Sequence, residues 1–207
     1  MARLLAALSD QSKTMFSLKD AAAITGLRPG SAGTLLHKAA KRGLLSHVKR
    51  DLFVVNVLAP YLLTALLTAP SRLVYLSSGM HRGGEADLHD PQWKSRPWNG
   101  SQAYANSKLL DVVLAFAIAR RWPRTISTAT EPGWVPTKMG GSSAPDDLSL
   151  GAVTQAWLAA SDDAAAKVSG GYFYHQKARE VHPMANDAKL QEHLLSYCAS
   201  VCGVPMP

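Results

Sequence analysis

The chain has 207 residues, of which 47% are hydrophobic and 18% are charged, and its formal net charge is +7. This composition is ordinary for a globular protein, so it allows a packed core and argues against wholesale disorder. The apolar runs at residues 1 to 9 and 53 to 69 are too short or too interrupted for a signal-peptide core or a membrane span. The sequence therefore predicts a soluble cytoplasmic protein without a membrane partner.

The positive charge is concentrated at the beginning of the chain. Residues 1 to 55 contain nine Lys or Arg and three Asp, a net charge of +6, whereas residues 56 to 207 carry only +1. Such asymmetry predicts a basic module for an anionic partner at residues 1 to 55, joined to a nearly neutral body at residues 56 to 207.

The basic module is expected to contain helices followed by a β-hairpin. Ser17 and Ser31 are suitable helix N-caps, and Gly26 and Gly43 are natural helix stops. The stretch LLSHVKRDLFVV, residues 44 to 55, then has two short apolar runs around a basic turn, which is typical of a hairpin. This order of elements resembles the winged helix-turn-helix domain of antitoxin-type transcriptional regulators.

The winged-helix resemblance implies DNA binding, with residues 30 to 42 in the major groove. The basic side chains that it places at the phosphates, mostly without regard to base sequence, are Lys38, Lys41, Arg42, His47, Lys49 and Arg50.

Two other interpretations of residues 24 to 33, ITGLRPGSAG, stay open. The stretch imitates the glycine turn of short-chain dehydrogenases, in which glycines let the backbone approach a pyrophosphate at a helix N-terminus. The imitation is partial, because Ala32 takes the place of the third glycine and the alanines at residues 21 to 23 favour a helix over a strand. Alternatively, these glycines only end helices.

The second part of the chain contains three segments in a distinctive order. Residues 71 to 78 predict a buried strand that runs into two serines, and YANSK at residues 104 to 108 opens a long amphipathic helix. Residues 125 to 131 predict another strand, which leads into PGWVPT. Together with NVLAPYLLT upstream and GGYFYHQKARE downstream, these segments resemble the C-terminal half of the short-chain dehydrogenase/reductase family.

The spacing of Tyr104 and Lys108 has a chemical reason. Residues four apart share one helical face, so the ammonium group of Lys108 should favour the phenolate and lower the pKa of Tyr104 from its usual ~10. Tyr104 would then act as a general acid and base. The family resemblance implies that Ser78 binds the substrate carbonyl and that Asn56 holds a water of the proton relay. Ser77 in place of Ser78, and a helix-capping role for Asn56, remain alternatives.

The same resemblance implies NAD or NADP as the cofactor. Lys108 would grip the nicotinamide ribose beside Tyr104, and the residues after the second strand would contact the nicotinamide: Pro132, Gly133, Val135 and Thr137. No metal site is expected, and Cys198 and Cys202 are interpreted as reduced thiols without a role, because no further ligands lie at suitable spacing.

The sequence departs from the family in its first half. It contains no Asn-Asn-Ala-Gly-type motif, and only 79 residues separate Thr25 from Tyr104, too few for the family's first strand-helix units. We therefore expect an α/β fold, with a partial Rossmann-like, mostly parallel sheet and flanking helices at residues 56 to 207, behind a small winged-helix-like module.

The predicted function is NAD(P)-dependent oxidation or reduction of a small alcohol or carbonyl compound, impaired by the missing cofactor-binding half. The alternative is a non-enzymatic DNA-binding regulator that uses the reductase-like part as a scaffold or dimerisation unit. A homodimer is expected in either case, because two helices carry apolar faces that a monomer would expose. These faces comprise Leu62, Leu63 and Leu66 on one helix and Leu109, Val112, Val113 and Phe116 on the other.

Overall fold

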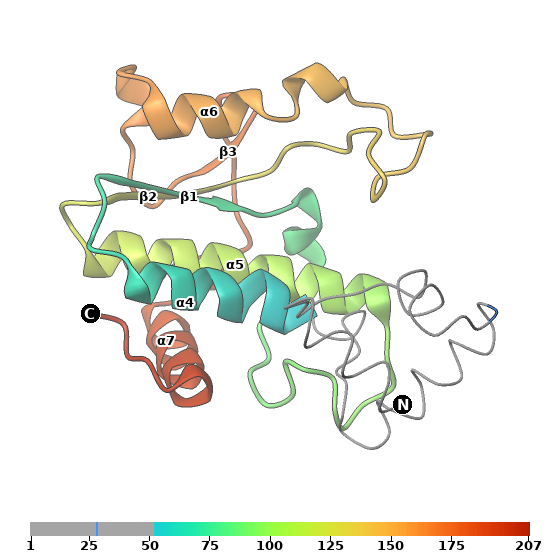
Figure 1. Cartoon of the computed structure of the whole chain (residues 1–207), viewed down its shortest axis with the longest axis vertical. Coiled ribbons are helices and arrows are strands. Elements are labelled where there is room, and N and C mark those ends of the chain that lie inside the picture. The colour runs from blue at the N-terminus through green and yellow to red at the C-terminus, as the bar shows by residue number, and fades with distance from the viewer. Residues whose placement is uncertain (1–27, 29–51) are drawn as a thin grey trace. The chain divides into compact units, whose positions relative to one another are not determined.

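The computed structural model of the chain describes Arg28 and residues 52 to 207 (Figure 1). In chain order the elements are η2 (Val54–Leu58), α4 (Ala59–Leu66), β1 (Arg72–Leu76), η3 (Gly79–Gly83), α5 (Gly100–Arg121), β2 (Ile126–Thr130), η4 (Leu148–Leu150), α6 (Val153–Ala160), η5 (Ala164–Ala166), β3 (Tyr172–Tyr174), β4 (Lys177–Ala178), η6 (Pro183–Asn186) and α7 (Ala188–Cys202). The predicted winged helix and its DNA-contacting residues, Lys38, Lys41, Arg42, His47, Lys49 and Arg50, lie outside the described residues.

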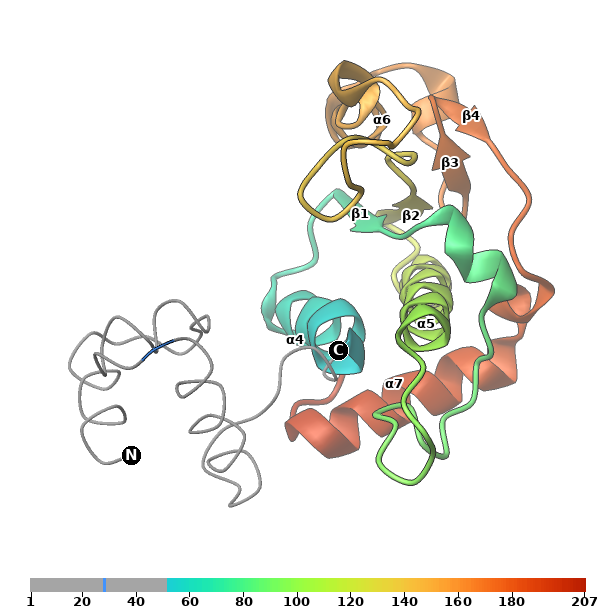
Figure 2. The same cartoon turned by 90° about the vertical axis from the view of Figure 1, so that its right-hand side faces the viewer.

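The centre of the described fold is a four-stranded sheet in the order β1-β2-β3-β4. The pairs β1–β2 and β2–β3 are parallel, and β3–β4 is antiparallel. Parallel strands need cover on both faces, which α4 and α5 provide on one side and α6 on the other, with α7 packed beneath α4 and α5 (Figures 1 and 2). The expected α/β fold with a small, mostly parallel sheet is confirmed for this part of the chain.

The long helix α5 is the core element of this fold. The Asn99 side chain caps it by accepting a hydrogen bond from Gln102 N, and its interior is buried nearly all round from Ala103 to Ile118. Helices that are apolar on every side are found inside a protein rather than on its surface. The sheet, η3, α4 and α7 surround α5 (Figure 2).

The end of the predicted hairpin is helical, so the strand predicted over residues 52 to 55 is wrong. Leu52 and Phe53 are α-helical, and the chain continues through the π-helical turn η2 into α4. Phe53, Val57 and Tyr61 are buried at spacings of four residues, which is helical spacing. This core face outweighs the strand preference of the β-branched residues in LFVV.

The two apolar helix faces differ in exposure. Leu63 and Leu66 of α4 are each 67% exposed, as expected. The α5 face was expected to be exposed as well, but it is buried within the chain because α7 and the sheet pack against this helix: Leu109, Val112, Val113 and Phe116. Of the two helix faces expected to contact a second copy, the α4 face is therefore the exposed one.

Three further structural features bear on the predictions from the sequence. No described helix is both long and apolar enough to span a membrane. Cys198 is buried and Cys202 is partly exposed, and both are free thiols. Burial, and secondarily the neighbouring Cys202, raise the pKa of Cys198 to about 12, so this thiol is unreactive near neutral pH.

Candidate active site

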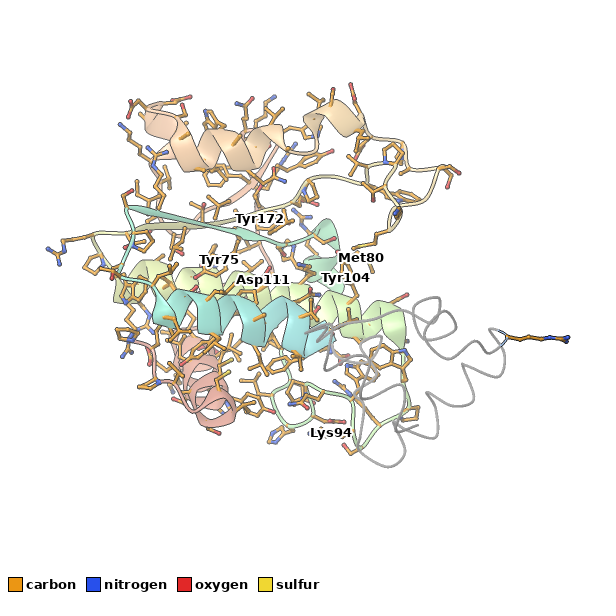
Figure 3. All side chains as sticks on the ribbon, in the orientation of Figure 1. Tyr75, Met80, Lys94, Tyr104, Asp111 and Tyr172 are labelled. Carbon is orange, nitrogen blue, oxygen red and sulfur yellow. The ribbon has the colours of Figure 1, made fainter. Side chains whose placement is uncertain are left out.

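The loops that follow β1 and β2 meet at the carboxyl-terminal end of the sheet. Because the two strands are parallel, their carboxyl ends lie side by side, and Ser77 N donates to Thr130 O at 2.7 Å there. Open α/β sheets commonly bind ligands outside the carboxyl ends of their strands. The first turns of α5 reach the same place, so Tyr104 lies beside Met80 of the loop after β1 (Figure 3).

The two serines after β1 have different surroundings. Ser77 is buried, and its Oγ donates to the carbonyl of Lys108 at 2.8 Å, which fastens β1 to α5. Ser78 is half-buried, accepts a hydrogen bond from Met80 N at 3.3 Å, and lies close enough to Tyr104 to lower the pKa of its phenol. The hydroxyl of Ser77 is therefore used in holding β1 against α5, whereas Ser78 is the serine that lies near the Tyr104 phenol.

The phenol of Tyr104 is harder to ionise here than the sequence predicted. Burial raises the pKa of Tyr104, the negative charge of Asp111 raises it further, and the nearby Ser78 side chain lowers it. Lys108 is not among the groups that shift it, although it lies one helical turn away. Shared helical spacing therefore does not by itself bring the ammonium group to the phenol.

Lys108 is held by other partners. Its Nζ donates to the carbonyl of Leu76 at 2.5 Å and lies 3.6 Å from Asp111 Oδ2. Burial raises the pKa of the Asp111 carboxyl to about 7, and the adjacent Lys108 opposes this shift. The Oδ1 atom of Asp111 has no hydrogen-bond partner among the described residues. The charge of Lys108 is thus directed to β1 and Asp111.

Asp111 is a site residue that the sequence interpretation missed. A carboxylate within the apolar run LLDVVLAF, three residues after a lysine, is an unusual choice for a buried helix. Charged residues are rarely buried unless they are paired, and positions i and i+3 of a helix are neighbours. Those two observations together could have identified the Lys108–Asp111 pair before the structure was known.

Asn56 lies in the middle of the π-helical turn η2. Its Nδ2 donates to Ser107 Oγ at 3.0 Å, and Ser107 Oγ donates to the Tyr104 carbonyl at 2.8 Å. These two hydrogen bonds attach Asn56 to α5 between Tyr104 and Lys108. The alternative role as a helix cap is wrong, because the helix has already begun at Leu52. Single π-helical turns frequently occur at functional sites.

The loop after β2 carries the residues predicted to contact a nicotinamide. Gly133 has φ +85°, and a Cβ at this position would come within 2.5 Å of Asp146 Oδ2. Asp146 also accepts from Trp134 N, so this carboxylate shapes the turn. The loop continues through Val135, which is partly buried, to Thr137, which is exposed. Glycine is required here because a side chain would be both strained and crowded.

The loops after β1 and β2 also contact each other. Arg82 lies 3.6 Å from Glu131 as an ion pair, and a Cβ at Gly79 would meet the Glu131 carboxylate at 2.5 Å. Pro132 and Gly133 therefore lie next to the Ser78 loop. Val135 and Thr137 are on the same loop, but their described contacts are within it rather than to Tyr104 or Lys108.

A groove of about 340 Å³ lies along β1. It is lined by side chains of η2, α4 and β1, and Asn56, Lys108 and Asp111 lie on its surface. The residues that the sequence identified on separate elements thus lie around the first turns of α5. Asn56 and Lys108 line the groove, and Ser78 lies close enough to Tyr104 to affect its pKa.

Comparison with known proteins gives relatives for the C-terminal part of the chain. An uncharacterized oxidoreductase of Emericella nidulans is 42% identical over 158 residues, which cover 75% of this chain and 59% of the relative. A short-chain dehydrogenase of Penicillium rubens is 38% identical, with 74% and 60% covered. Human retinol dehydrogenase 13 is 32% identical, with 75% and 54% covered. No protein-family model matches.

The chain spans between 54% and 60% of the length of these three relatives. Proteins named as oxidoreductases or dehydrogenases thus match about three quarters of this chain, in its C-terminal part. A crystal structure of an uncharacterized protein from Mycobacterium paratuberculosis has a similar fold, with a TM-score of 0.62 and 22% identity over 75% of this chain and 59% of that one.

Proposed function

We propose that residues 52 to 207 carry the acid–base part of an NAD(P)-dependent oxidoreductase site of the short-chain dehydrogenase type, which acts on the carbonyl or alcohol group of a small molecule. The observation that carries this proposal is that hydrogen bonds tie α5 to the carboxyl end of β1, beside Ser78, and to η2: Lys108 Nζ donates to the Leu76 carbonyl, Ser77 Oγ donates to the Lys108 carbonyl, and Asn56 Nδ2 donates to Ser107 Oγ next to Tyr104. Lys108 lies one helical turn further along α5, and Asn56 is fastened to the same helix.

The chemistry of each of these side chains suits a specific role in the proposed reaction. The Ser78 hydroxyl donates to the substrate oxygen, and the Tyr104 phenol gives a proton to that oxygen or takes one from it. A bound NAD(P) supplies or accepts the hydride. Asn56, which is bonded to Ser107 on α5, would hold a water through which the phenol exchanges its proton with solvent. With a raised pKa the Tyr104 phenol is in its acid form near neutral pH, which is the form that carbonyl reduction requires.

The described residues fit the nicotinamide end of the cofactor only. An ammonium group has three donors, so Lys108 can keep its bond to Leu76 and its pairing with Asp111 and still offer one hydrogen to a ribose hydroxyl. Gly133 is held in a left-handed turn against Asp146, which sets the path of the loop after β2 beside the Ser78 loop. Beyond β1, the described part of the chain offers no further strand to hold the adenosine and pyrophosphate.

A turnover assay tests this function. We expect slow oxidation of NADPH or NADH by a panel of aldehydes and ketones, and a loss of at least about a hundredfold in Tyr104→Phe, which is typical of removing a general acid. Tyr197→Phe is the matched control, because this tyrosine lies on α7 against Phe53 and far along the chain from the site. Equal rates in both variants would refute the role of Tyr104.

A further inference from the structure

His81 is a buried histidine that follows Ser78 by three residues. It belongs to the short helical turn η3, which Ser78 caps, and its side chain is fully buried. Histidine is usually less completely enclosed, so a ring without any exposed surface calls for a structural or chemical reason. The proposed function as described so far gives this ring no part.

Two groups of His81 hold the backbone carbonyl of Ser78. The His81 amide donates to Ser78 O at 3.0 Å and closes the turn, and the ring Nδ1 lies 2.8 Å from the same oxygen. A carbonyl oxygen has two lone pairs and can only accept, so the ring nitrogen carries the hydrogen of this bond. Ser78 O therefore receives two hydrogen bonds, which together fix the plane of the peptide that follows Ser78.

Strand β3 holds the ring of His81 in place. The ring centroid lies 4.5 Å from that of the buried Tyr172, at an interplanar angle of 44°. Burial lowers the pKa of His81, the bond to Ser78 raises it, and the other groups that face the ring, Arg82 and His182, lower it. The ring nitrogen Nε2 has no hydrogen-bond partner in the described part of the chain. A neutral ring with its hydrogen on Nδ1 agrees with all of these surroundings at pH 7.

The backbone that His81 holds sets the direction of the Ser78 hydroxyl. Ser78 is extended, with φ −153° and ψ 151°, and its Oγ accepts from Met80 N at 3.3 Å. This bond uses one lone pair of the hydroxyl and leaves its hydrogen for another acceptor. If the Ser78 carbonyl turned away from the ring, the Met80 amide would move with it, and the hydroxyl would lose its fixed direction.

The opposite end of η3 is fixed to α5 next to Tyr104. A Cβ at Gly84 would lie 2.7 Å from the carbonyl oxygen of Ala105, so the two backbones are in close contact there. Because this end of the turn is attached to α5, the ring of His81 determines how the other end, which bears Ser78, lies relative to the phenol.

We propose that His81 is a positioning residue for Ser78: its ring donates through Nδ1 to the Ser78 carbonyl and so holds the Ser78 hydroxyl in the direction of the substrate oxygen. This role rests on the proposed function, in which Ser78 donates to that oxygen. Such a donor contributes most when negative charge develops on the oxygen in the transition state. Loss of the His81 ring should therefore lower kcat and leave the KM for the cofactor unchanged.

Variants of the full chain test this role in the NAD(P)H turnover assay. His81→Leu removes the donor and should lower kcat at least about tenfold, because a small misplacement of a reacting group is costly. His81→Asn offers an amide N–H near the position of Nδ1 and should recover most of this loss. Leu194→Ala, at a fully buried position of α7, controls for lost stability and should keep its kcat. Equal losses in His81→Leu and His81→Asn, or in His81→Leu and Leu194→Ala, would overturn the role.

A second comparison separates positioning from a general structural effect. In a Ser78→Ala background, His81→Leu should lower kcat no further, because the hydroxyl that the ring positions is gone. A further tenfold loss in the double variant would show that His81 acts on the site by another route, and would overturn the role.

NMR of the histidine ring nitrogens in the wild-type protein needs no turnover and therefore distinguishes this role from the proposed function. At pH 7 the His81 ring should be neutral, with its hydrogen on Nδ1, and this hydrogen should exchange slowly with solvent because the ring is buried. A hydrogen on Nε2, or a charged ring, would overturn the role even in an active protein. The expected ring in a protein without any turnover would instead overturn the proposed function, while the hold of His81 on Ser78 would stand.

Discussion

At the scale of single residues, Asp111 controls the charge balance of the candidate site. It shares the Lys108 ammonium with the Leu76 carbonyl, and its own charge raises the pKa of Tyr104. A buried ion pair of this kind is seldom a net source of stability, because two charges have to leave water. Its effect on the site is to hold Lys108 toward β1 rather than toward the phenol.

The raised pKa of Asp111 makes a prediction about stability and pH. In the folded chain burial raises this pKa to about 7, whereas the unfolded chain releases the proton near the ordinary value. Between these two pKa values the folded state binds more protons, so its unfolding free energy should fall as the pH rises through this window, by up to ~1.4 kcal/mol per pH unit. Asp111→Asn cannot ionise and should lose this part of the dependence. Urea unfolding at pH 5 and pH 8 measures it, and identical pH dependence in both proteins would contradict the assignment.

At the scale of elements, the strand ends and α5 were predictable from the sequence, and the beginning of the described chain was not. Residues 71 to 78 and 125 to 131 are short apolar runs that end in polar turns, so local pattern defines them. LFVV has strand propensity, but the core face formed by Phe53 with Val57 and Tyr61 made it helical. The direction in which Lys108 points also depends on packing, which residue spacing does not contain.

The exposed face of α4 gives the prediction at this scale. Because Leu63 and Leu66 are each 67% exposed, α4 is the described element best suited to pack against its copy in a homodimer. Static light scattering at micromolar concentration should give the mass of a dimer, and Leu66→Glu should shift it toward the monomer. A wild-type protein that scatters as a clean monomer would rule this contact out.

At the scale of the whole molecule, the uneven distribution of charge predicts an anionic partner for residues 1 to 55. A net charge of +6 on residues 1 to 55 favours salt-dependent binding to duplex DNA. We expect Lys41→Glu combined with Arg42→Glu to abolish this binding in an electrophoretic mobility assay. Lys177→Glu combined with Arg179→Glu makes the same change of charge on the exposed β4 region and should retain it. Binding that both double variants preserve, or that salt does not weaken, would argue against a DNA-binding module.

The extent of the described sheet also determines how much of an NAD(P) molecule the described residues can bind. Ser78, Tyr104, Lys108 and the loop after β2 serve the nicotinamide end, and the described sheet ends at β1. Each missing hydrogen bond to the adenosine or pyrophosphate costs about 0.5 to 1.5 kcal/mol, and ~1.4 kcal/mol is tenfold in affinity. The loss of several such bonds should weaken binding by a few orders of magnitude against an intact relative.

Titration of reduced cofactor, followed by its fluorescence, tests this account most directly. With the purified 207-residue chain, we predict binding a few orders of magnitude weaker than that of the full-length Emericella nidulans relative, and weaker still in Lys108→Ala. Binding as tight as that of the relative, retained in Lys108→Ala but lost when Gly26 and Gly30 are replaced by valine, would contradict the account, because residues 24 to 33 would then be a working nucleotide turn.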